Sequence, residues 1–365
     1  MRALVLNAGS SSLKWSLLDA AATTLLDSGS EPWGEGDAAE PVFARLRALP
    51  PPGAVGHRLV HGGARLRQAV VLDDGVRREL AALAEVDPLH TARALAGVDA
   101  AFAAFPGVPE VAAFDTAFHA TLPDAAAVYP IPHEWTERYG LRRYGFHGLS
   151  VAYAVRRAAE LLGGMPRRLA VCHLGSGCSA TAVLDGRSVD TTMGFTPLEG
   201  LMMATRSGTV DPGLLLHLET ERGLSPAEID DALNRRSGLL GVSGVSADLR
   251  QVLQAADAGN PRARLAYDLF VHRLRRELGG LVAALAGLDA LVFTGGIGEH
   301  ASRVRTDAVA PFADLGAALD PAKNAAAVSG QGDAEITATG ARARTLVIEA
   351  REDLSVLAEM RQALG

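Results

Sequence analysis

Short apolar runs alternate with longer amphipathic stretches along the whole chain. The apolar runs are bounded by turn residues, which is typical of buried strands in an α/β sheet. They occupy residues 3–6, 54–59, 111–114, 169–173, 180–184, 290–294 and 345–348. Apolar positions at helical spacing predict helices over residues 76–84, 151–162, 226–234, 263–286 and 354–364. Stretches rich in glycine, proline and small residues predict surface loops at 29–41, 50–53 and 329–333.

A glycine-centred turn between apolar runs occurs twice, at residues 4–14 and again at residues 170–180. A constant offset of 166 residues pairs Val5 with Val171 and Gly9 with Gly175. Each copy is typical of a strand, a tight turn and a second strand. The small turn residues leave backbone N–H groups and hydroxyls to bind an anion such as phosphate. We therefore expect two duplicated domains around a nucleotide cleft.

The length and composition agree with two domains. The chain has 365 residues, of which 48% are hydrophobic and 21% are charged, so it can form two cores. The repeat restarts shortly after residues 145–150. We therefore predict an N-terminal domain made of residues 1–148 plus 353–365, and a C-terminal domain made of residues 149–352.

The net charge and the number of cysteines argue against several classes of protein. A net charge of −7 argues against a nucleic-acid partner. Cys172 and Cys178 are the two cysteines, and their number and spacing predict neither a disulfide framework nor a zinc site. The N-terminus lacks the long apolar region of a signal peptide, and no apolar run is long enough for a membrane span. We expect a cytoplasmic protein that does not bind membranes.

Four loops carry side chains suited to chemistry, and three of them also contain glycines. Residues 57–63 place a basic cluster and two glycines after a strand, and residues 114–119 end another strand with a carboxylate and a histidine. Residues 190–212 contain a single arginine among Thr, Gly and Met, and residues 293–299 form a third glycine-rich turn after a strand. Together they are much stronger evidence for a phosphate-handling enzyme than any one of them.

With these segments, the chain resembles the acetate kinase family, which belongs to the superfamily of sugar kinases, actin and Hsp70. The matching segments are 7–14, 57–63, 114–119, 142–148, 173–177, 191–212, 237–250 and 293–299. The resemblance implies two duplicated actin-like (ribonuclease H-like) α/β domains. It also implies direct in-line transfer of the ATP γ-phosphoryl group to acetate, giving acetyl phosphate and ADP, or the reverse. Positive charge and positioning should stabilise such a transition state.

The resemblance assigns residues to the acceptor and to the transferring phosphoryl group. Arg58 matches the arginine that holds the substrate carboxylate, and Asp115 matches the active-site acid/base, with a metal-binding role left open. His147 and Arg206 match the residues that stabilise the transferring phosphoryl group. The second active-site histidine position falls on His90, and the apolar pocket around the substrate methyl group falls on Val60, Leu89, Phe146 and Pro197.

Nucleotide and metal residues follow from the same resemblance. Asn7 and Glu352 match the site for Mg²⁺ or Mn²⁺, with Glu349 and Asp353 as competitors of Glu352, and Lys14 matches a phosphate-side lysine. The segments that match the ATP/ADP-binding stretches are His173, Leu174, Gly175, Ser176 and Gly177; Asp248, Leu249 and Arg250; and Gly296, Ile297, Gly298, Glu299 and His300. Ser176 and His300 stand where the family commonly has Asn, so contacts to the adenine should differ.

Two other functions stay open. A propionate or butyrate kinase would use the same chemistry, because one methylene changes binding in such a pocket by only ~1–3 kcal/mol. A nucleotide-binding switch of the actin or Hsp70 kind would not need a carboxylate-binding arginine, so the motifs around Arg58, Asp115 and Arg206 favour an enzyme. The resemblance also implies a homodimer.

Overall fold

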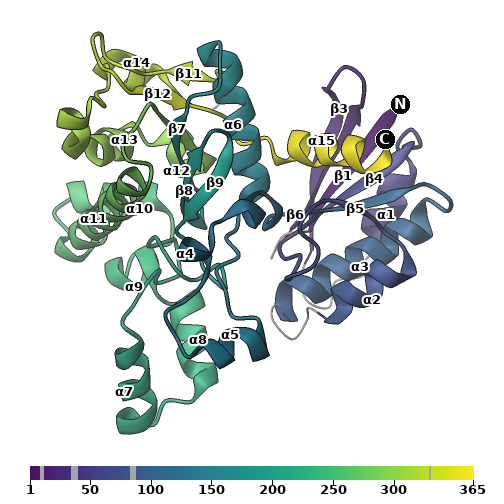
Figure 1. The fold of residues 1–365 in the computed structure, drawn as a ribbon, viewed down its shortest axis with the longest axis horizontal. Coiled ribbons are helices and arrows are strands. Elements are labelled where there is room, and N and C mark those ends of the chain that lie inside the picture. The colour runs from purple at the N-terminus through teal and green to yellow at the C-terminus, as the bar shows by residue number, and fades with distance from the viewer. Residues whose placement is uncertain (9–11, 34–39, 83–87, 329) are drawn as a thin grey trace. The chain divides into compact units, whose positions relative to one another are not determined.

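The computed structural model describes residues 1–8, 12–33, 40–82, 88–328 and 330–365, with the backbone alone for 40–42 and 88–92. The chain divides into two compact units (Figure 1). Unit 1 comprises Met1–Ala120, Phe146–Tyr153 and Arg351–Gly365, and unit 2 comprises Thr121–Gly145 and Ala154–Ala350. The sequence-based division assigned residues 121–145 to the N-terminal domain, whereas here they belong to unit 2. It assigned residues 149–153 and 351–352 to the C-terminal domain, whereas here they belong to unit 1.

Unit 1 is built on a six-stranded mixed sheet in the order β3-β2-β1-β4-β6-β5. Strands β1, β4 and β6 are parallel, and β2, β3 and β5 pair antiparallel with their neighbours. The strand bounds are β1 (Arg2–Ala8), β2 (Ser12–Asp19), β3 (Thr24–Pro32), β4 (Ala54–Leu59), β5 (Val70–Val71) and β6 (Glu110–Phe114). The helices are α1 (Glu40–Arg47), α2 (Asp74–Ala82), α3 (Pro88–Ala104), α15 (Glu352–Leu364), the short 3₁₀ helix η2 (Ala117–Thr121) and the first part of α6 (Gly148–Leu162).

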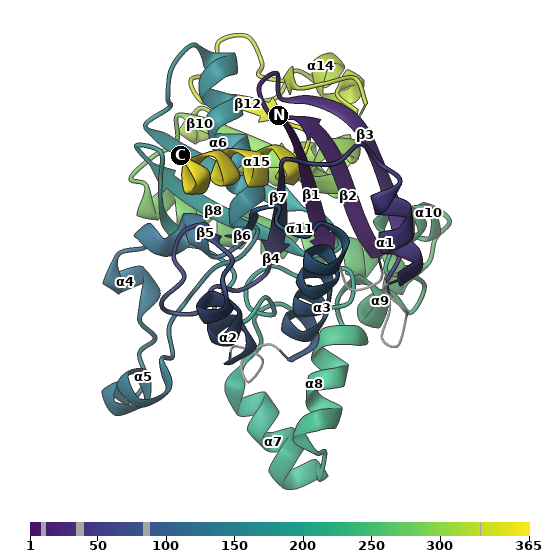
Figure 2. The same cartoon turned by 90° about the vertical axis from the view of Figure 1, so that its right-hand side faces the viewer.

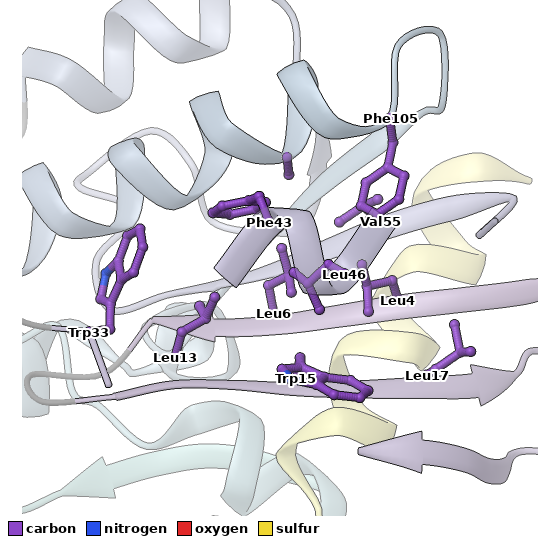
Figure 3. Close-up of a cluster of buried hydrophobic side chains, with 11 residues drawn as sticks. Leu4, Leu6, Leu13, Trp15, Leu17, Trp33, Phe43, Leu46, Val55 and Phe105 are labelled. Atoms are coloured by element: carbon purple, nitrogen blue, oxygen red, sulfur yellow. The ribbon is translucent and has the colours of Figure 1, made fainter. Parts of the chain in front are cut away.

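Helices cover both faces of this sheet (Figure 2). On one face, alternate residues of β1 and β2 form a core with α1 and α3, and Leu4, Leu6 and Trp15 belong to the same buried cluster as Phe43 and Phe105 (Figure 3). On the other face, the intervening residues pack against α15. Because side chains of a strand alternate between faces, the near-continuous apolar runs of β1 and β4 reflect burial on both sides.

Unit 2 repeats the same sheet in the order β9-β8-β7-β10-β12-β11. Its strands are β7 (Arg168–Leu174), β8 (Cys178–Leu184), β9 (Arg187–Thr191), β10 (Ala290–Thr294), β11 (Ala334–Glu335) and β12 (Arg344–Val347). Both bounds of β7 lie 166 residues after those of β1. The parallel and antiparallel pairings also match strand for strand, so the duplication predicted from the sequence is confirmed.

The long helix α11 (Pro261–Ala284) packs against β7, β8 and β9 of unit 2. It begins after Asn260, whose side chain accepts hydrogen bonds from two backbone N–H groups of the first turn, and Pro261 follows at the first helical position. The other helices of this unit are α4 (Asp124–Ala127), α5 (His133–Tyr139), α7 (Pro212–Arg222), α8 (Pro226–Arg235), α9 (Gly238–Ser243), α10 (Leu249–Asp257), α12 (Gly295–His300), α13 (Ser302–Val309), η3 (Ala310–Leu315), α14 (Pro321–Ala326) and the end of α6.

All seven predicted strands and all five predicted helices are present, with ends shifted by a few residues. For the helix predicted at 76–84, residues 83 and 84 lie outside the described residues. The loop predicted at 29–41 is wrong for residues 29–32, which belong to β3, and for residues 40–41, which begin α1. Residues 34–39 lie outside the described residues, and Trp33 is buried in the core. The glycine that suggested a loop makes room for a side chain, because a Cβ on Gly29 would lie 2.6 Å from Trp15 Cζ2. Pro32 is tolerated at the end of this edge strand.

The predicted loop at 50–53 is confirmed, as is the part of the loop at 329–333 that the structure describes. Among the described helices, none combines the length and the apolar character that crossing a membrane requires.

Candidate active site

Three parallel strands of unit 1 end at one edge of the sheet, and each places a polar side chain on the same face. Ala3 and Val5 of β1 pack against α15, as do Ala54 of β4 and Val111 and Ala113 of β6. The next residues on this face, in the same order of strands, are Asn7, Arg58 and Asp115. Alternation along the strands therefore brings three distant segments of the chain together.

The helix α15 adds a fourth polar residue to this cluster, because Glu352 is its first residue. Arg58 donates from Nε to Asp115 Oδ1 at 3.2 Å and from Nη2 to Asp115 Oδ2 at 2.5 Å. Its Nη1 donates to Asn7 Oδ1 at 2.9 Å, and Nε lies 3.2 Å from Glu352 Oε2. Asn7 Nδ2 donates to the same Oε2 at 3.2 Å. We call Asn7, Arg58, Asp115 and Glu352 the arginine cluster.

The arginine cluster is largely removed from water, with side-chain exposures of 15% for Arg58, 1% for Asp115 and 21% for Glu352. Burial lowers the pKa of Arg58, but the charges of Asp115 and Glu352 and the hydrogen bonds to Asp115 outweigh it and raise that pKa. The guanidinium is therefore a fixed positive charge. Such a fork can grip a carboxylate or a phosphoryl group in a bidentate manner.

The two competitors of Glu352 have other partners. Glu349 accepts a hydrogen bond from Gly330 N at 2.5 Å in unit 2, and Asp353 accepts two from Arg351 at 2.9 Å each. Lys14 lies directly opposite Asn7 in the β1–β2 pair and is exposed. Because directly paired residues share a face, the ammonium group of Lys14 belongs to the side of the sheet that bears the arginine cluster.

The backbone next to His147 is hydrogen-bonded to Asp115. Gly148 N donates to Asp115 O at 2.8 Å, and a Cβ on Gly148 would lie 2.2 Å from that oxygen, so the close approach requires glycine. His147 itself has a φ of 59°, an unusual value for a residue other than glycine. His119 also holds this segment, through its contact of 3.0 Å from Nε2 to Phe146 O. Left-handed backbone at such a position is typical of functional sites.

The residues predicted for the methyl pocket fall in both units. Phe146 is buried in unit 1 and packs edge-to-face against His61, and Val60 is half-buried at the end of β4. Leu89 and His90 lie in the first turn of α3, where side chains are outside the described residues. Pro197 lies in unit 2, where its carbonyl accepts a hydrogen bond from Arg206 Nη1 at 3.0 Å.

Unit 2 contains a pocket of about 820 Å³ next to the second glycine turn, within the usual range for a small-molecule site. Eight of the predicted nucleotide residues line it, namely Gly175, Ser176, Asp248, Leu249, Arg250, Gly296, Ile297 and His300. The lining includes apolar Leu249, Leu253 and Ile297 as well as Arg250 and Arg303, a mixture that suits a ligand with a flat apolar ring and an anionic tail.

The other five predicted nucleotide residues, His173, Leu174, Gly177, Gly298 and Glu299, are not part of the pocket lining in the described structure. Glu299 has a structural contact instead, because its Oε1 accepts a hydrogen bond from Ala350 N at 3.0 Å. Six lining residues were missed from the sequence, namely Ala204, Ala247, Leu253, Ala301, Ser302 and Arg303. Leu253 lies one helical turn after Leu249, so helical spacing could have found it.

A buried arginine supports the α12 wall of this pocket. Arg305 is 0% exposed and donates from Nη1 to Gly298 O and Glu299 O at 2.7 and 2.8 Å. Its Nε and Nη2 donate to Asn324 Oδ1, Asn324 O and Ala327 O at 2.7–2.8 Å. All five N–H groups are used, and the acceptors include carbonyls at the ends of α12 and α14. Burial lowers the pKa of Arg305 to about 10.

Arg206 lies in the loop between β9 and α7, which contacts the second glycine turn. Ala204 N donates to Ser176 O at 3.1 Å, and the charge of Arg206 acts on Cys178 at the end of that turn. The Cys178 thiol is buried, and burial raises its pKa to about 12, so this cysteine is not reactive. Arg206 and the glycine turn are therefore neighbours within unit 2.

The oxygen donors of the arginine cluster fit a hard divalent cation. Within the part of the chain whose side chains the structure describes, no group of three or more His, Cys, Asp or Glu is arranged to hold a metal ion. Mg²⁺ commonly needs fewer protein ligands, because it keeps waters and binds substrate phosphates alongside one or two carboxylates. Glu352, Asp115 and the amide oxygen of Asn7 supply that donor set.

Comparison with solved structures defines the class of fold. The chain is similar to the acetate kinase of Porphyromonas gingivalis, with a TM-score of 0.91 and 34% identity over 100% of both chains. It is also similar to a propionate kinase from Francisella tularensis, with a TM-score of 0.89 and 35% identity over 98% of both. The fold is thus α/β with two duplicated actin-like domains, as predicted.

Comparison of sequences gives the family. The profile of the Acetokinase family matches residues 52–358. The chain is 49% identical to the acetate kinase of Trichormus variabilis over 83% of this chain and 74% of that protein. It is 51% identical to the acetate kinase of a Synechococcus strain over 83% of this chain and 75% of the relative. The chain belongs to the Acetokinase family.

Proposed function

We propose that this chain is an ATP:acetate phosphotransferase, which transfers the γ-phosphoryl group of ATP reversibly and in line to acetate, giving acetyl phosphate and ADP. The observation that carries the proposal is the arginine cluster, a fixed guanidinium surrounded by two carboxylates and an amide at the ends of three strands. Membership of the Acetokinase family and the names of the relatives support it.

Arg58 binds the acceptor carboxylate in this proposal. The guanidinium charge offsets the negative charge that acetate and the γ-phosphoryl group bring together, which otherwise opposes the reaction. Asp115 holds the guanidinium in a single plane through two hydrogen bonds and so fixes the direction from which acetate attacks. His90 would be a second contact to the acceptor or phosphoryl group, and it stays a prediction.

The nucleotide binds in the unit 2 pocket in this proposal. Its base lies against Leu249, Leu253 and Ile297, and the phosphates extend toward the Gly175–Gly177 turn. Arg206, in the loop that contacts this turn, and His147 stabilise the transferring phosphoryl group. Lys14 adds charge on the phosphate side. These roles agree with a loose, anionic transition state that is stabilised by positioning and positive charge.

Mg²⁺, or Mn²⁺ in its place, would be held by Glu352 and Asn7, with Asp115 as the third oxygen donor. When bound, the ion neutralises phosphate charge as ATP reacts. The homodimer and the cytoplasmic location stay predictions from the family resemblance.

The choice between acetate and propionate depends on the volume around the acceptor methyl group. A propionate kinase is among the similar structures, at 35% identity. Val60 is half-buried two residues after Arg58 and is larger than alanine, which favours acetate. Because one methylene changes the free energy of binding by only ~1–3 kcal/mol, propionate should react to some degree.

A coupled assay of ADP release with and without acetate tests the proposal. A kinase releases ADP at a rate that depends on acetate and saturates with it. A nucleotide-dependent switch instead hydrolyses ATP slowly whether or not acetate is present. ADP release that is independent of acetate, propionate and butyrate would disprove the proposed function.

A further inference from the structure

Tyr129, Arg143 and Glu199 form a polar cluster in unit 2, and we call it the Glu199 cluster. Glu199 Oε1 accepts a hydrogen bond from Arg143 Nη2 at 2.8 Å, and Oε2 accepts one from the Tyr129 hydroxyl. The Arg143 guanidinium also lies 5.5 Å from the centroid of the Tyr129 ring. The three residues come from separate segments, so the cluster exists only in the folded chain.

The Glu199 cluster binds the backbone of residues 192–195. Arg143 Nη1 donates to Thr192 O at 3.1 Å and to Met193 O at 3.0 Å. Phe195 N donates to the Tyr129 hydroxyl oxygen at 2.9 Å. Burial and the hydrogen bond to Glu199 raise the pKa of Tyr129, so its hydroxyl remains a donor at neutral pH. Each polar group of the cluster therefore has a defined partner.

Gly194 permits this arrangement. A Cβ at this position would lie 1.7 Å from Glu199 Oε2 and 2.2 Å from the Tyr129 hydroxyl oxygen. The carbonyl of Gly194 also accepts hydrogen bonds from Tyr144 N and Gly145 N at 3.1 and 3.3 Å. The backbone of residues 192–199 thus packs closely against the side chains of the Glu199 cluster.

The same segment holds Arg206. The carbonyl of Pro197, two residues before Glu199, accepts the hydrogen bond of 3.0 Å from Arg206 Nη1. A second contact of Arg206 Nη1, to Met203 Sδ at 3.8 Å, is weaker. A shift of the Pro197 carbonyl would therefore move the guanidinium.

We propose that Tyr129, Arg143 and Glu199 are positioning residues that orient Arg206 through the segment 192–199. The inference rests on the proposed function, in which Arg206 stabilises the transferring phosphoryl group. Because a misplacement of about 1 Å can cost about 100-fold in rate, a cluster that never touches the substrate can still control turnover.

The test is a double-mutant cycle on kcat with Tyr129→Phe and Arg206→Lys. Tyr129→Phe removes the hydroxyl that binds Glu199 and Phe195, and we expect kcat to fall about 10-fold or more. If Tyr129 acts through Arg206, the double variant loses much less than the product of the two single losses. A purely structural role predicts that the losses multiply, because they then arise independently.

Two further variants make the test specific. Tyr144→Phe is a matched control, because the Tyr144 hydroxyl donates to Gly140 O at an exposed turn and its loss should leave kcat unchanged. Glu199→Gln keeps the shape of the side chain but weakens the bond to Arg143, and it should give a smaller loss with the same non-additivity. It replaces Tyr129→Phe if that variant does not fold.

The outcomes separate this inference from the proposed function. A wild-type chain without acetate-dependent ADP release overturns the proposed function. An active wild type whose Tyr129→Phe and Glu199→Gln variants retain full kcat, or whose losses multiply with that of Arg206→Lys, overturns the positioning role alone.

Discussion

Replacement of Arg58 is expected to separate its role in catalysis from its role in stability. Arg58→Ala removes three hydrogen bonds, two to Asp115 and one to Asn7, and the ion pair with Glu352. Breaking a buried ion pair by removing one partner costs ~3–5 kcal/mol of folding free energy. Loss of a donor that is needed in the transition state costs a further ~2.7–4 kcal/mol, or about 100- to 1,000-fold in kcat.

Arg58→Lys isolates the geometric part of this effect. Lysine keeps the positive charge, but its single nitrogen cannot span both carboxylate oxygens of Asp115 and reach Asn7 as well. Loss of even one charge-assisted hydrogen bond of ~1.5–3 kcal/mol predicts a fall in kcat of about 10- to 100-fold. We therefore expect the lysine variant to be folded and poorly active.

The assay is the initial rate of ADP release at saturating ATP and acetate, together with thermal denaturation of each variant. Arg65→Ala is the control, because Arg65 pairs with Glu79 on the surface of the same unit, with Arg65 81% exposed. Such a pair contributes at most ~1 kcal/mol, so neither kcat nor Tm should change much. An Arg58→Lys variant with wild-type kcat would refute the reasoning, because charge alone would then be sufficient.

The remaining predictions concern the pocket, the metal and pH. Val60→Ala should raise kcat/KM for propionate relative to acetate, and an unchanged ratio would exclude Val60 from the pocket. Glu352→Gln should raise the Mg²⁺ concentration for half-maximal activity, whereas Glu349→Gln should not, and equal effects would contradict the assignment. Asp115→Asn should stay inactive at any Mg²⁺ level, so rescue by Mg²⁺ would make Asp115 chiefly a metal ligand. Burial lowers the pKa of His119 from 6.5 to about 4. As the pH falls from 6.5 to about 4, the unfolded chain therefore binds a proton at this histidine before the folded chain does. The free energy of unfolding should decrease by about 3 kcal/mol over this pH range. The pH dependence of urea unfolding should be correspondingly weaker in His119→Gln, and an identical dependence would contradict this.

The parts of the fold that were predictable depend on local pattern. Apolar runs between turn residues located the strands, and the offset of 166 residues located the repeat. Both features were predictable because strands and tight turns depend on residues that are close together in the sequence. The polar residues at strand ends were also predictable as candidates. Alternation along β1, β4 and β6 then explains why Asn7, Arg58 and Asp115 meet on one face.

What was not predictable depends on contacts between distant segments. The edge strand β3 has a polar sequence typical of a loop, and only the ring of Trp15 against Gly29 explains its glycine. Arg305 gives no sequence signal, because four of its five acceptors are backbone carbonyls, of Gly298, Glu299, Asn324 and Ala327. Likewise, the sequence alone could not decide between Glu352 and Glu349 as the metal ligand. The two differ in their hydrogen-bond partners, because Glu352 contacts Asn7 of unit 1 and Glu349 contacts Gly330 of unit 2.

The most direct test of the central claim is the formation of acetyl phosphate itself. The purified chain would be incubated with ATP, Mg²⁺ and acetate, and the acyl phosphate trapped with hydroxylamine as the hydroxamate. We predict one acetyl hydroxamate for each ADP released, and formation of both products about 100- to 1,000-fold more slowly with Arg58→Ala. ADP released without hydroxamate would contradict the account, because the γ-phosphoryl group would then have gone to water rather than to acetate.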